Sequence, residues 1–174
     1  MAETFNDKTL SPAKADRYAE LAVEIAAVLE NEADVVARMA TVVAMLAQSF
    51  SAFLWTGFYV VDEKRPGELV VGPYQGTLGC LRIAFGKGVC GTAAATRQTQ
   101  IVPDVEAFPG HIACDGRSRS EIVTPVIDAD GRLLGVLDVD SADLAAFDET
   151  DALWLERIMA DVFRRRIPIN TTLP

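Results

Sequence analysis

The sequence has few of the side chains that build metal sites. It contains a single histidine, His111, and three cysteines, and no two cysteines form a C-x-x-C pair. Structural zinc sites need several ligands supplied in close pairs, so we expect no zinc site. No loop has the ligand spacing of a calcium site either. We therefore expect no metal and no other cofactor.

Basic residues are scarce, and long apolar runs are absent. The chain has 16 Lys and Arg against 25 Asp and Glu, which gives a formal net charge of −9. An acidic chain repels phosphate groups, so nucleic acids and anionic membranes are not expected partners. The short apolar stretches predict no transmembrane helix, and the first residues lack the pattern of a signal peptide. We expect a cytoplasmic protein whose cysteines are thiols rather than a structural disulfide framework.

The spacing of apolar residues divides the chain into three parts of one domain, residues 1–174. Residues 11–50 predict a helical hairpin, in which Ser11-Pro12 begins the first helix and Asn31 or Asp34 caps the second. Residues 148–166 predict a C-terminal helix. The sheet core at 51–141 predicts strands at 52–61, 69–74, 100–102, 121–127 and 132–139, and a small-residue helix after residue 89. Antiparallel hairpins with helices on one side indicate an α+β fold.

Cys114 is the cysteine with the most polar surroundings. It lies in a long loop, 104–120, and loops of that length in compact domains tend to be functional. Its neighbours in GHIACDGRSRS include a histidine and two arginines, which predict a thiol of lowered pKa. The alternative is a buried thiol that packs like a small apolar group. That description suits Cys90, which precedes the small-residue helix.

Carboxylates form a second group of candidate residues. Asp138 and Asp140 are two apart on a predicted strand, so their side chains share a face, and Glu121 begins the partner strand. Three such groups around one pocket would raise a carboxyl pKa and attract a cation, such as a substrate ammonium. From the residues alone, solvated strand-end acids remain the favoured interpretation. Trp55 and Tyr59 share a strand face, a pattern more typical of core than of a ligand site.

Three segments together resemble one known family. GPYQGTLGCLRIAFGKGVCGTAA, VPDVEAFPGHIACDGRSRSEIV and GVLDVDS are similar to the free methionine-(R)-sulfoxide reductases, which are GAF-domain proteins. The likeness begins near Trp55, continues to the final helix, and includes all three cysteines in order. The chain departs from the family pattern at Leu78-Gly79, in place of a Pro-Ala-like pair, and at Glu106, in place of a histidine. The resemblance implies a GAF-like fold with an antiparallel sheet flanked by helices.

The resemblance also implies an activity, the thiol-dependent reduction of free L-methionine (R)-sulfoxide to methionine. Cys114 would attack the sulfoxide sulfur and become a sulfenic acid. Cys80 would be the resolving thiol that forms a Cys80–Cys114 disulfide, and Cys90 would assist binding or exchange. A thioredoxin-like dithiol would then restore both thiols.

The same resemblance implies how the substrate is held. Glu121, Asp138 and Asp140 would surround the free amino acid, and Trp55 and Tyr59 would enclose its methyl group. Members of the family are typically homodimers. The alternative functions are a non-catalytic GAF sensor of a small molecule or of redox state, and a stand-alone thiol peroxidase.

Overall fold

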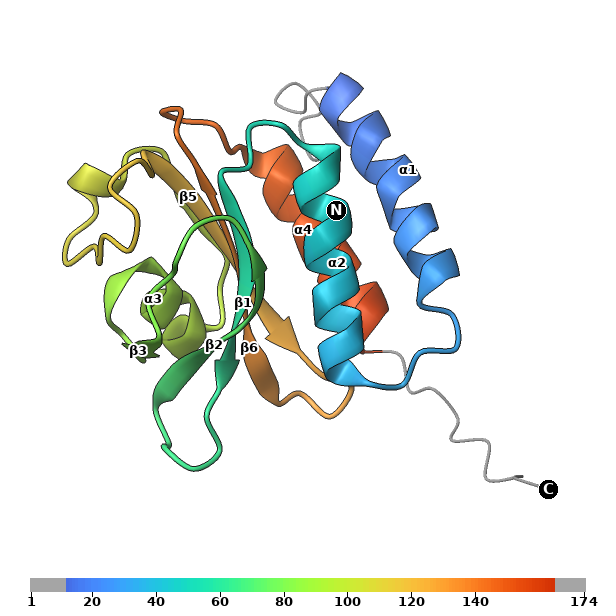
Figure 1. Ribbon diagram of the computed structural model, residues 1–174, viewed down its shortest axis with the longest axis horizontal. Helices are drawn as coiled ribbons and strands as arrows, with labels where there is room; N and C mark the ends of the chain where they lie inside the picture. The colour runs from blue at the N-terminus through green and yellow to red at the C-terminus, as the bar shows by residue number, and fades with distance from the viewer. Residues whose placement is uncertain (1–11, 165–174) are drawn as a thin grey trace, which may run out of the picture.

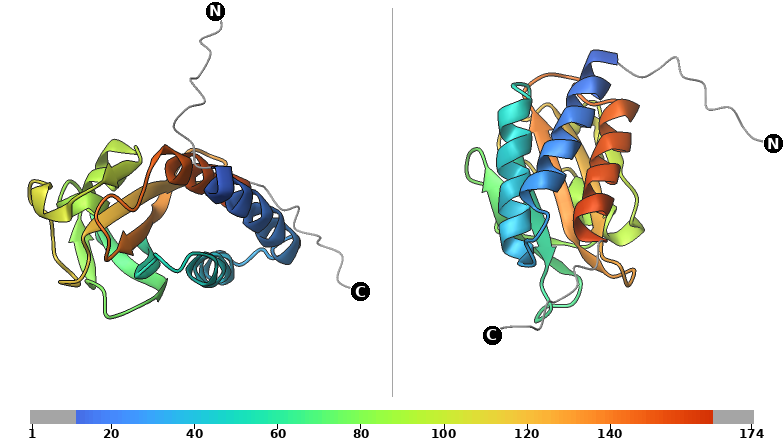
Figure 2. Two further views of the ribbon diagram at one scale, coloured as in Figure 1. Left: turned by 90° about the horizontal axis from the view of Figure 1, so that it is seen from above. Right: turned by 90° about the vertical axis from the view of Figure 1, so that its right-hand side faces the viewer.

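The computed structural model describes residues 12–164, in which one antiparallel sheet lies between two layers. Helices α1 (Pro12–Val28), α2 (Val35–Ser49) and α4 (Glu149–Phe163) lie on one side of the sheet. The short helix α3 (Gly88–Thr96) lies on the other side with the longer loops (Figures 1 and 2). The predicted cap at Ser11 and the predicted helix end at 165–166 fall outside the described residues.

The sheet follows the predicted strands closely and adds one short strand. Among the described residues it has six strands in the order β3-β2-β1-β6-β5-β4, and each neighbouring pair is antiparallel. The strands are β1 (Trp55–Val61), β2 (Glu68–Gln75), β3 (Arg82–Ala84), β4 (Gln100–Val102), β5 (Ser120–Ile127) and β6 (Leu133–Ser141). The sequence analysis missed β3 and the 3₁₀ turn η1 (Val105–Ala107). Three residues are too few to show a strand or helix period.

Side-chain caps begin the helices where the sequence predicts them. The Asp34 side chain accepts a hydrogen bond from the Ala37 N–H at the start of α2. At the start of α4, Asp148 and Asp151 form a reciprocal capping box. The buried Asp151 carboxylate also accepts from Tyr18 Oη at 2.9 Å and from Lys14 Nζ at 2.6 Å, which ties α1 to α4.

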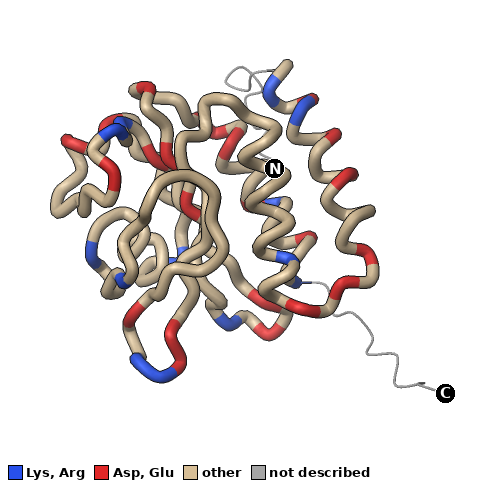
Figure 3. The backbone as a smooth tube through the Cα atoms, viewed as in Figure 1, with Lys and Arg blue, Asp and Glu red and all other residues tan. Residues whose placement is uncertain are grey.

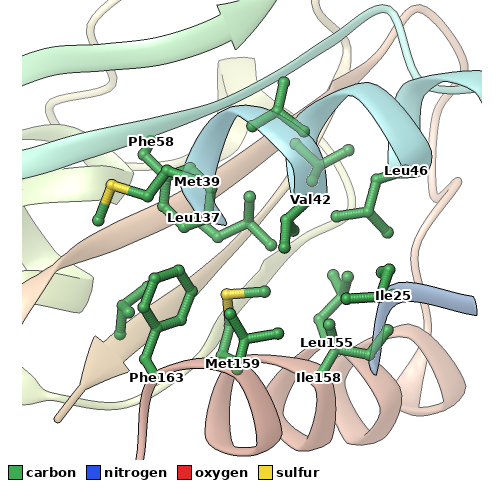
Figure 4. Close-up of a cluster of buried hydrophobic side chains, with 14 of the residues drawn as sticks. Ile25, Met39, Val42, Leu46, Phe58, Leu137, Leu155, Ile158, Met159 and Phe163 are labelled. Carbon is green, nitrogen blue, oxygen red and sulfur yellow. The ribbon is translucent and has the colours of Figure 1, made fainter. Parts of the chain in front are cut away.

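The main hydrophobic core lies between the sheet and the three long helices. Figure 4 shows side chains of α2, among them Met39 and Leu46, opposite Leu155 and Met159 of α4. Phe58 of β1 is also part of this cluster and is fully buried. Each such side chain contributes roughly 1.5–3 kcal/mol by leaving water, so this layer holds the sheet in place.

A smaller core on the other face of the sheet brings α3 close to the strands. Val89 and Ala93 of α3 pack with Val123 and Val136 of the sheet. A Cβ on Gly91 would lie 2.2 Å from the carbonyl oxygen of Ala84, so only glycine allows this approach. The close contact places the first turn of α3 directly over the sheet.

Acidic positions are spread along the chain and outnumber the basic ones (Figure 3). The turn that joins β1 to β2 carries charges of both signs, and Arg82 pairs there with Asp62 and Glu68. No described helix is long and apolar enough to cross a membrane.

Candidate functional site

Strand register brings the predicted carboxylates together. Glu121 of β5 lies directly opposite Asp140 of β6, and Asp138 lies two residues before Asp140 on β6. Alternation along a strand then points Asp138 and Asp140 to one face. On the other side of β6, Trp55 of β1 pairs with Asp140, and Gly57 pairs with Asp138. The three acids therefore meet near one end of the central strands, on the face that α3 covers.

One pocket collects nearly all the predicted site residues. It lies between the sheet, the start of α3 and the two loops that carry Cys80 and Cys114. Seven of the eight predicted residues line it, and the eighth, Cys80, is bonded to one of them. The lining residues predicted from the sequence are Trp55, Tyr59, Cys90, Cys114, Glu121, Asp138 and Asp140.

The expected disulfide between Cys80 and Cys114 is present. Their Cα atoms are 5.3 Å apart, within the normal range for a disulfide. Cys114 is exposed at the edge of the pocket, and Cys80 is half-buried. Cys90 is free and buried. Since the chain has three cysteines, Cys90 is its only thiol in this oxidised form.

A polar cluster joins the two cysteine loops beside the disulfide. Thr77 donates its hydroxyl to the Asp115 carboxylate, which also pairs with Arg117 at 2.7 Å. Arg117 contacts Thr77 Oγ1 as well, at 3.3 Å. These bonds hold the pKa of Asp115 well below its usual range, with the hydrogen bond from Arg117 as the largest cause. The Cys80 loop and the Cys114 loop are therefore held together by more than the disulfide.

The sequence predicts that one histidine and two arginines make the surroundings of Cys114 positive. For two of these three groups the prediction is wrong. Arg117 is paired with Asp115, so the charge of the carboxylate offsets that of the guanidinium. Burial lowers the pKa of His111, so its ring is neutral near pH 7. Its Nε2 lies 3.8 Å from Glu121 Oε2, which is beyond hydrogen-bond distance. The sequence shows that Arg117 and His111 lie near Cys114, but it does not show that Arg117 is paired or that His111 is partly buried.

Two of the three carboxylates are buried and Asp140 is half-buried, so the interpretation as solvated strand-end acids is wrong. Asp138 is 5% exposed and Glu121 is 6% exposed. Burial, followed by the charge of Asp140, raises the pKa of both groups. Burial also raises the pKa of Asp140, to about 6, against a hydrogen bond from Ser118. The site thus holds at least one carboxylic acid in its neutral form near neutral pH.

Cys90 lies at the floor of the pocket beside these acids. Its Sγ is 3.8 Å from Glu121 Oε1. Burial raises the pKa of the thiol well above its usual range, and the charges of Asp138 and Glu121 raise it further. Cys90 is therefore a buried thiol, as the sequence analysis allowed, but it faces acids as well as apolar side chains. These three residues are also the only group among the described residues with metal-ligand spacing.

The aromatic side chains form one wall of the pocket. Trp55 stacks on Tyr59 with ring centroids 5.6 Å apart, and its Nε1 donates to the Thr77 carbonyl at 3.0 Å. A Cβ on Gly79 would lie 3.0 Å from Tyr59 Oη and 3.1 Å from the Trp55 ring. The departure at Leu78-Gly79 thus brings the backbone close over both rings, while Leu78 itself is 75% exposed.

Sequence reasoning missed some pocket residues. Ser118, which supports Asp140, and Ile112 both come from the Cys114 loop, and Lys87 precedes α3. The only signal for them was the length and polarity of that loop. A loop has no period from which the direction of a side chain can be predicted.

Comparison with known proteins agrees with this geometry. Residues 30–162 match the family described as "GAF domain". The free methionine-R-sulfoxide reductase of Escherichia coli (strain K12) is 39% identical over 149 residues, which cover 86% of this chain and 88% of that protein. The chain belongs to the free methionine-R-sulfoxide reductase family of GAF-domain proteins.

Two further members of this family are more similar in sequence. The free methionine-R-sulfoxide reductase of Saccharomyces cerevisiae (strain ATCC 204508 / S288c) is 55% identical over 104 residues, 60% of this chain, and the match spans 58% of the yeast protein. The X-ray structure of the enzyme of Neisseria meningitidis in complex with its substrate is 46% identical, with a TM-score of 0.82. That comparison covers 91% of this chain and 93% of the neisserial one.

Proposed function

We propose that this protein reduces free L-methionine (R)-sulfoxide to methionine, with Cys114 as the attacking thiolate. One observation carries the proposal: the pocket that exposes Cys114 at its edge also holds the buried carboxylates of Glu121 and Asp138 and the half-buried one of Asp140. A thiol that reaches the sulfur and acids that bind an ammonium group are the two features that this reaction needs in one place. Family membership supports the same activity.

The reaction balances with the residues of the pocket. The Cys114 thiolate gives two electrons to the sulfoxide sulfur, the sulfur–oxygen bond breaks, and Cys114 becomes a sulfenic acid. The sulfoxide oxygen needs a proton as it leaves the methionine sulfur, and a neutral carboxylic acid of the trio supplies it. The Cys80 thiol then attacks the sulfenic sulfur and releases water, which forms the disulfide. An external dithiol returns both cysteines to thiols.

Selectivity for the free amino acid follows from the acids. A substrate ammonium offers three N–H donors and a positive charge to Glu121, Asp138 and Asp140. The amide nitrogen of a peptide-bound residue offers one donor and no charge, which would leave buried carboxylates without partners. The methyl group of the substrate would lie against Trp55 and Tyr59, the apolar wall of the pocket.

The test is to incubate the protein with racemic methionine sulfoxide and a dithiol, and to count the methionine released per chain. We expect many turnovers and consumption of the R form alone. No turnover by the wild-type protein would favour the GAF sensor. Equal rates on free and on N-acetylated methionine sulfoxide would reject the assignment of the acids to the ammonium group.

We further propose that the protein, as one GAF-type domain, is a cytoplasmic homodimer recycled by a thioredoxin-like protein. The exposed position of Cys114 supports attack by the thiolate of another protein. The cycle needs a reducing compartment to return the thiols, which favours the cytoplasm. The dimer is supported by exposed apolar side chains on the outer helices, including Val23 at 70% exposure on α1 and Val36 at 63% on α2.

A further inference from the structure

The floor of the pocket brings together a thiol and two carboxylates in a ligand arrangement that the proposed reaction does not explain. Cys90 Sγ and one carboxylate oxygen each of Glu121 and Asp138 all lie within 4.8 Å of one another. The three residues come from α3, β5 and β6, so the fold assembles this group from separate parts of the chain. Each is buried, and each lines the pocket, so a small ion can reach them.

A second observation points to a ligand at this position. Asp138 is 5% exposed, yet its Oδ1 has no hydrogen-bond partner among the described residues. A buried polar atom without a partner is unfavourable, and more so if it is charged. The carboxylate that carries this oxygen belongs to the same group of three residues, Cys90, Glu121 and Asp138.

We propose that Cys90, Glu121 and Asp138 bind a thiophilic divalent cation, with Zn²⁺ as the expected ion. Ideal zinc bonds, about 2.3 Å to sulfur and about 2.0–2.2 Å to oxygen, put tetrahedral ligand atoms roughly 3.3–3.7 Å apart. The distance from Cys90 Sγ to Glu121 Oε1 is 3.8 Å, so this pair is already close to that spacing. A contraction of about 1 Å would bring the widest pair to the zinc geometry.

The ligand set also selects the kind of ion. Magnesium and calcium need six or more oxygen ligands, whereas a thiolate with two carboxylates suits zinc and leaves one position open for water. The site differs from the structural zinc sites that the sequence excludes, because its ligands are not paired in sequence. Binding must release the Cys90 proton, since a thiolate is the form that coordinates zinc.

The cation and the substrate would compete for the same oxygens. This part of the inference rests on the proposed function, in which Glu121 and Asp138 hold the substrate ammonium. The metal site itself does not need the catalytic cysteines, because they are joined to each other while Cys90 is free. We therefore expect Zn²⁺ to bind the disulfide form and to be displaced by free methionine sulfoxide.

The test is to titrate Cd²⁺, as an ultraviolet-visible probe for Zn²⁺, into the disulfide form without added dithiol. We expect a sulfur-to-cadmium charge-transfer band that saturates at about one ion per chain, and Zn²⁺ that removes it by competition. Cys90→Ser should abolish the band. The double variant Cys80→Ser/Cys114→Ser, which keeps Cys90 as the only cysteine, should retain it. Absence of a band in the wild type, or its persistence in Cys90→Ser, would overturn the site.

A second set of measurements tests the carboxylates and does not depend on the cysteine variants. Asp138→Asn should weaken Zn²⁺ binding by at least about tenfold, whereas Asp143→Asn, at an exposed position just after β6, should not. In the wild type, Zn²⁺ affinity should rise with pH, with protons released into a weakly buffered solution. Equal affinity in both aspartate variants, or no proton release, would reject these ligands.

Competition separates this inference from the proposed function. Displacement of the metal by methionine sulfoxide, but not by its N-acetyl form, would support a shared set of carboxylates. If the amino acid does not displace the bound metal, the idea that both ligands use the same carboxylates is rejected, whereas the metal site is retained. Turnover of methionine sulfoxide by a protein that binds no metal would reject the metal site alone.

Discussion

Two cysteines of similar chemistry have different environments in this protein. Cys114 is exposed at the edge of the pocket and bonded to Cys80, whereas Cys90 is 3% exposed and lies beside acids. Burial and negative charge both favour the neutral thiol, so Cys90 is a poor nucleophile at neutral pH. These different surroundings predict a division of roles between the cysteines.

Single-turnover experiments on cysteine variants test this division. Reduced Cys80→Ser, given excess methionine sulfoxide without a reductant, should release about one methionine per chain and stop at the sulfenic acid. Cys114→Ser should release none. Released methionine is measured by chromatography and the sulfenic acid by mass spectrometry with a trapping reagent. A full equivalent from Cys114→Ser would disprove the assignment of the nucleophile.

The buried acids predict how stability depends on pH. Their pKa values are raised in the folded protein, so between the ordinary carboxyl pKa near 4 and the raised values the folded state binds more protons than the unfolded chain. Stability should then fall as pH rises through this window, by on the order of 1–3 kcal/mol between pH 5 and pH 8. Asp138→Asn should reduce that loss. Urea unfolding of the wild-type protein and of Asp138→Asn at these two pH values measures the change in stability. A larger loss of stability in the variant than in the wild type would contradict the prediction.

Local elements set the positions of the reactive groups. The first turn of α3 carries Cys90 to the floor of the pocket because Gly91 allows the helix to touch β3. The loops that carry Cys80 and Cys114 are joined by the cluster of Thr77, Asp115 and Arg117. The contact between α3 and β3 and the cluster between the two cysteine loops are both direct contacts between separate segments of the chain.

Gly91→Ala tests the contact between α3 and β3. The added methyl group would overlap the Ala84 carbonyl, so we expect a loss of about 1–3 kcal/mol in unfolding free energy. Gly116→Ala is the matched control, because a Cβ at Gly116 meets no atom within 4 Å. The control should change stability by less than about 0.5 kcal/mol. Similar unfolding curves for the two variants would show that the close approach does not constrain the protein.

Asp115→Asn tests the cluster between the two cysteine loops. Loss of the carboxylate charge weakens the pairing with Arg117 and the link to Thr77. Once the reduced protein has reacted and Cys114 is a sulfenic acid, the Cys80 thiol therefore spends less time near it. We expect disulfide formation to slow by roughly fivefold, with little change in the first methionine released. Rapid quenching followed by mass spectrometry measures both steps. Glu106→Gln, an exposed change in the same loop, is the control, and an equal slowing there would reject the role of Asp115.

The outer helices of the molecule expose four valines on the side of the sheet away from the pocket. These are Val23 and Val28 of α1, and Val35 and Val36 at the start of α2, all at least 44% exposed. Exposed apolar side chains that form a patch often mark a contact between proteins. A dimer formed there would leave the pocket open, because α1 and α2 cover the opposite face of the sheet (Figure 2).

A charge on this surface tests the homodimer. We expect the wild-type protein to have the mass of a dimer by light scattering, and Val36→Glu to shift it toward the monomer by more than about tenfold in dissociation constant. Leu144→Glu, at an exposed apolar position after β6, is the control and should leave the dimer intact. A monomeric wild type, or a dimeric Val36→Glu variant, would place any interface elsewhere.

Much of the secondary structure was predictable from the sequence, as was the set of candidate residues that share the pocket. The strands at 52–61, 69–74 and 121–127, the helix after residue 89 and the C-terminal helix from residue 148 all have counterparts in the structure. Strong periodicity and capping side chains are local signals, which is why these elements were predicted well. The short strand β3 and the residues of the Cys114 loop carry no such signal, and they were missed.

The sequence by itself determined the alternation that points Asp138 and Asp140 to one face, and the family motifs that identify the cysteines. Only the tertiary structure decided that Asp138 and Glu121 are buried, that Arg117 is paired with Asp115, and that Cys90 faces Glu121. The direction of a side chain along a strand depends on the local backbone. Burial and charge pairing depend on which distant segments pack together, and these set the pKa values that determine the chemistry of the pocket.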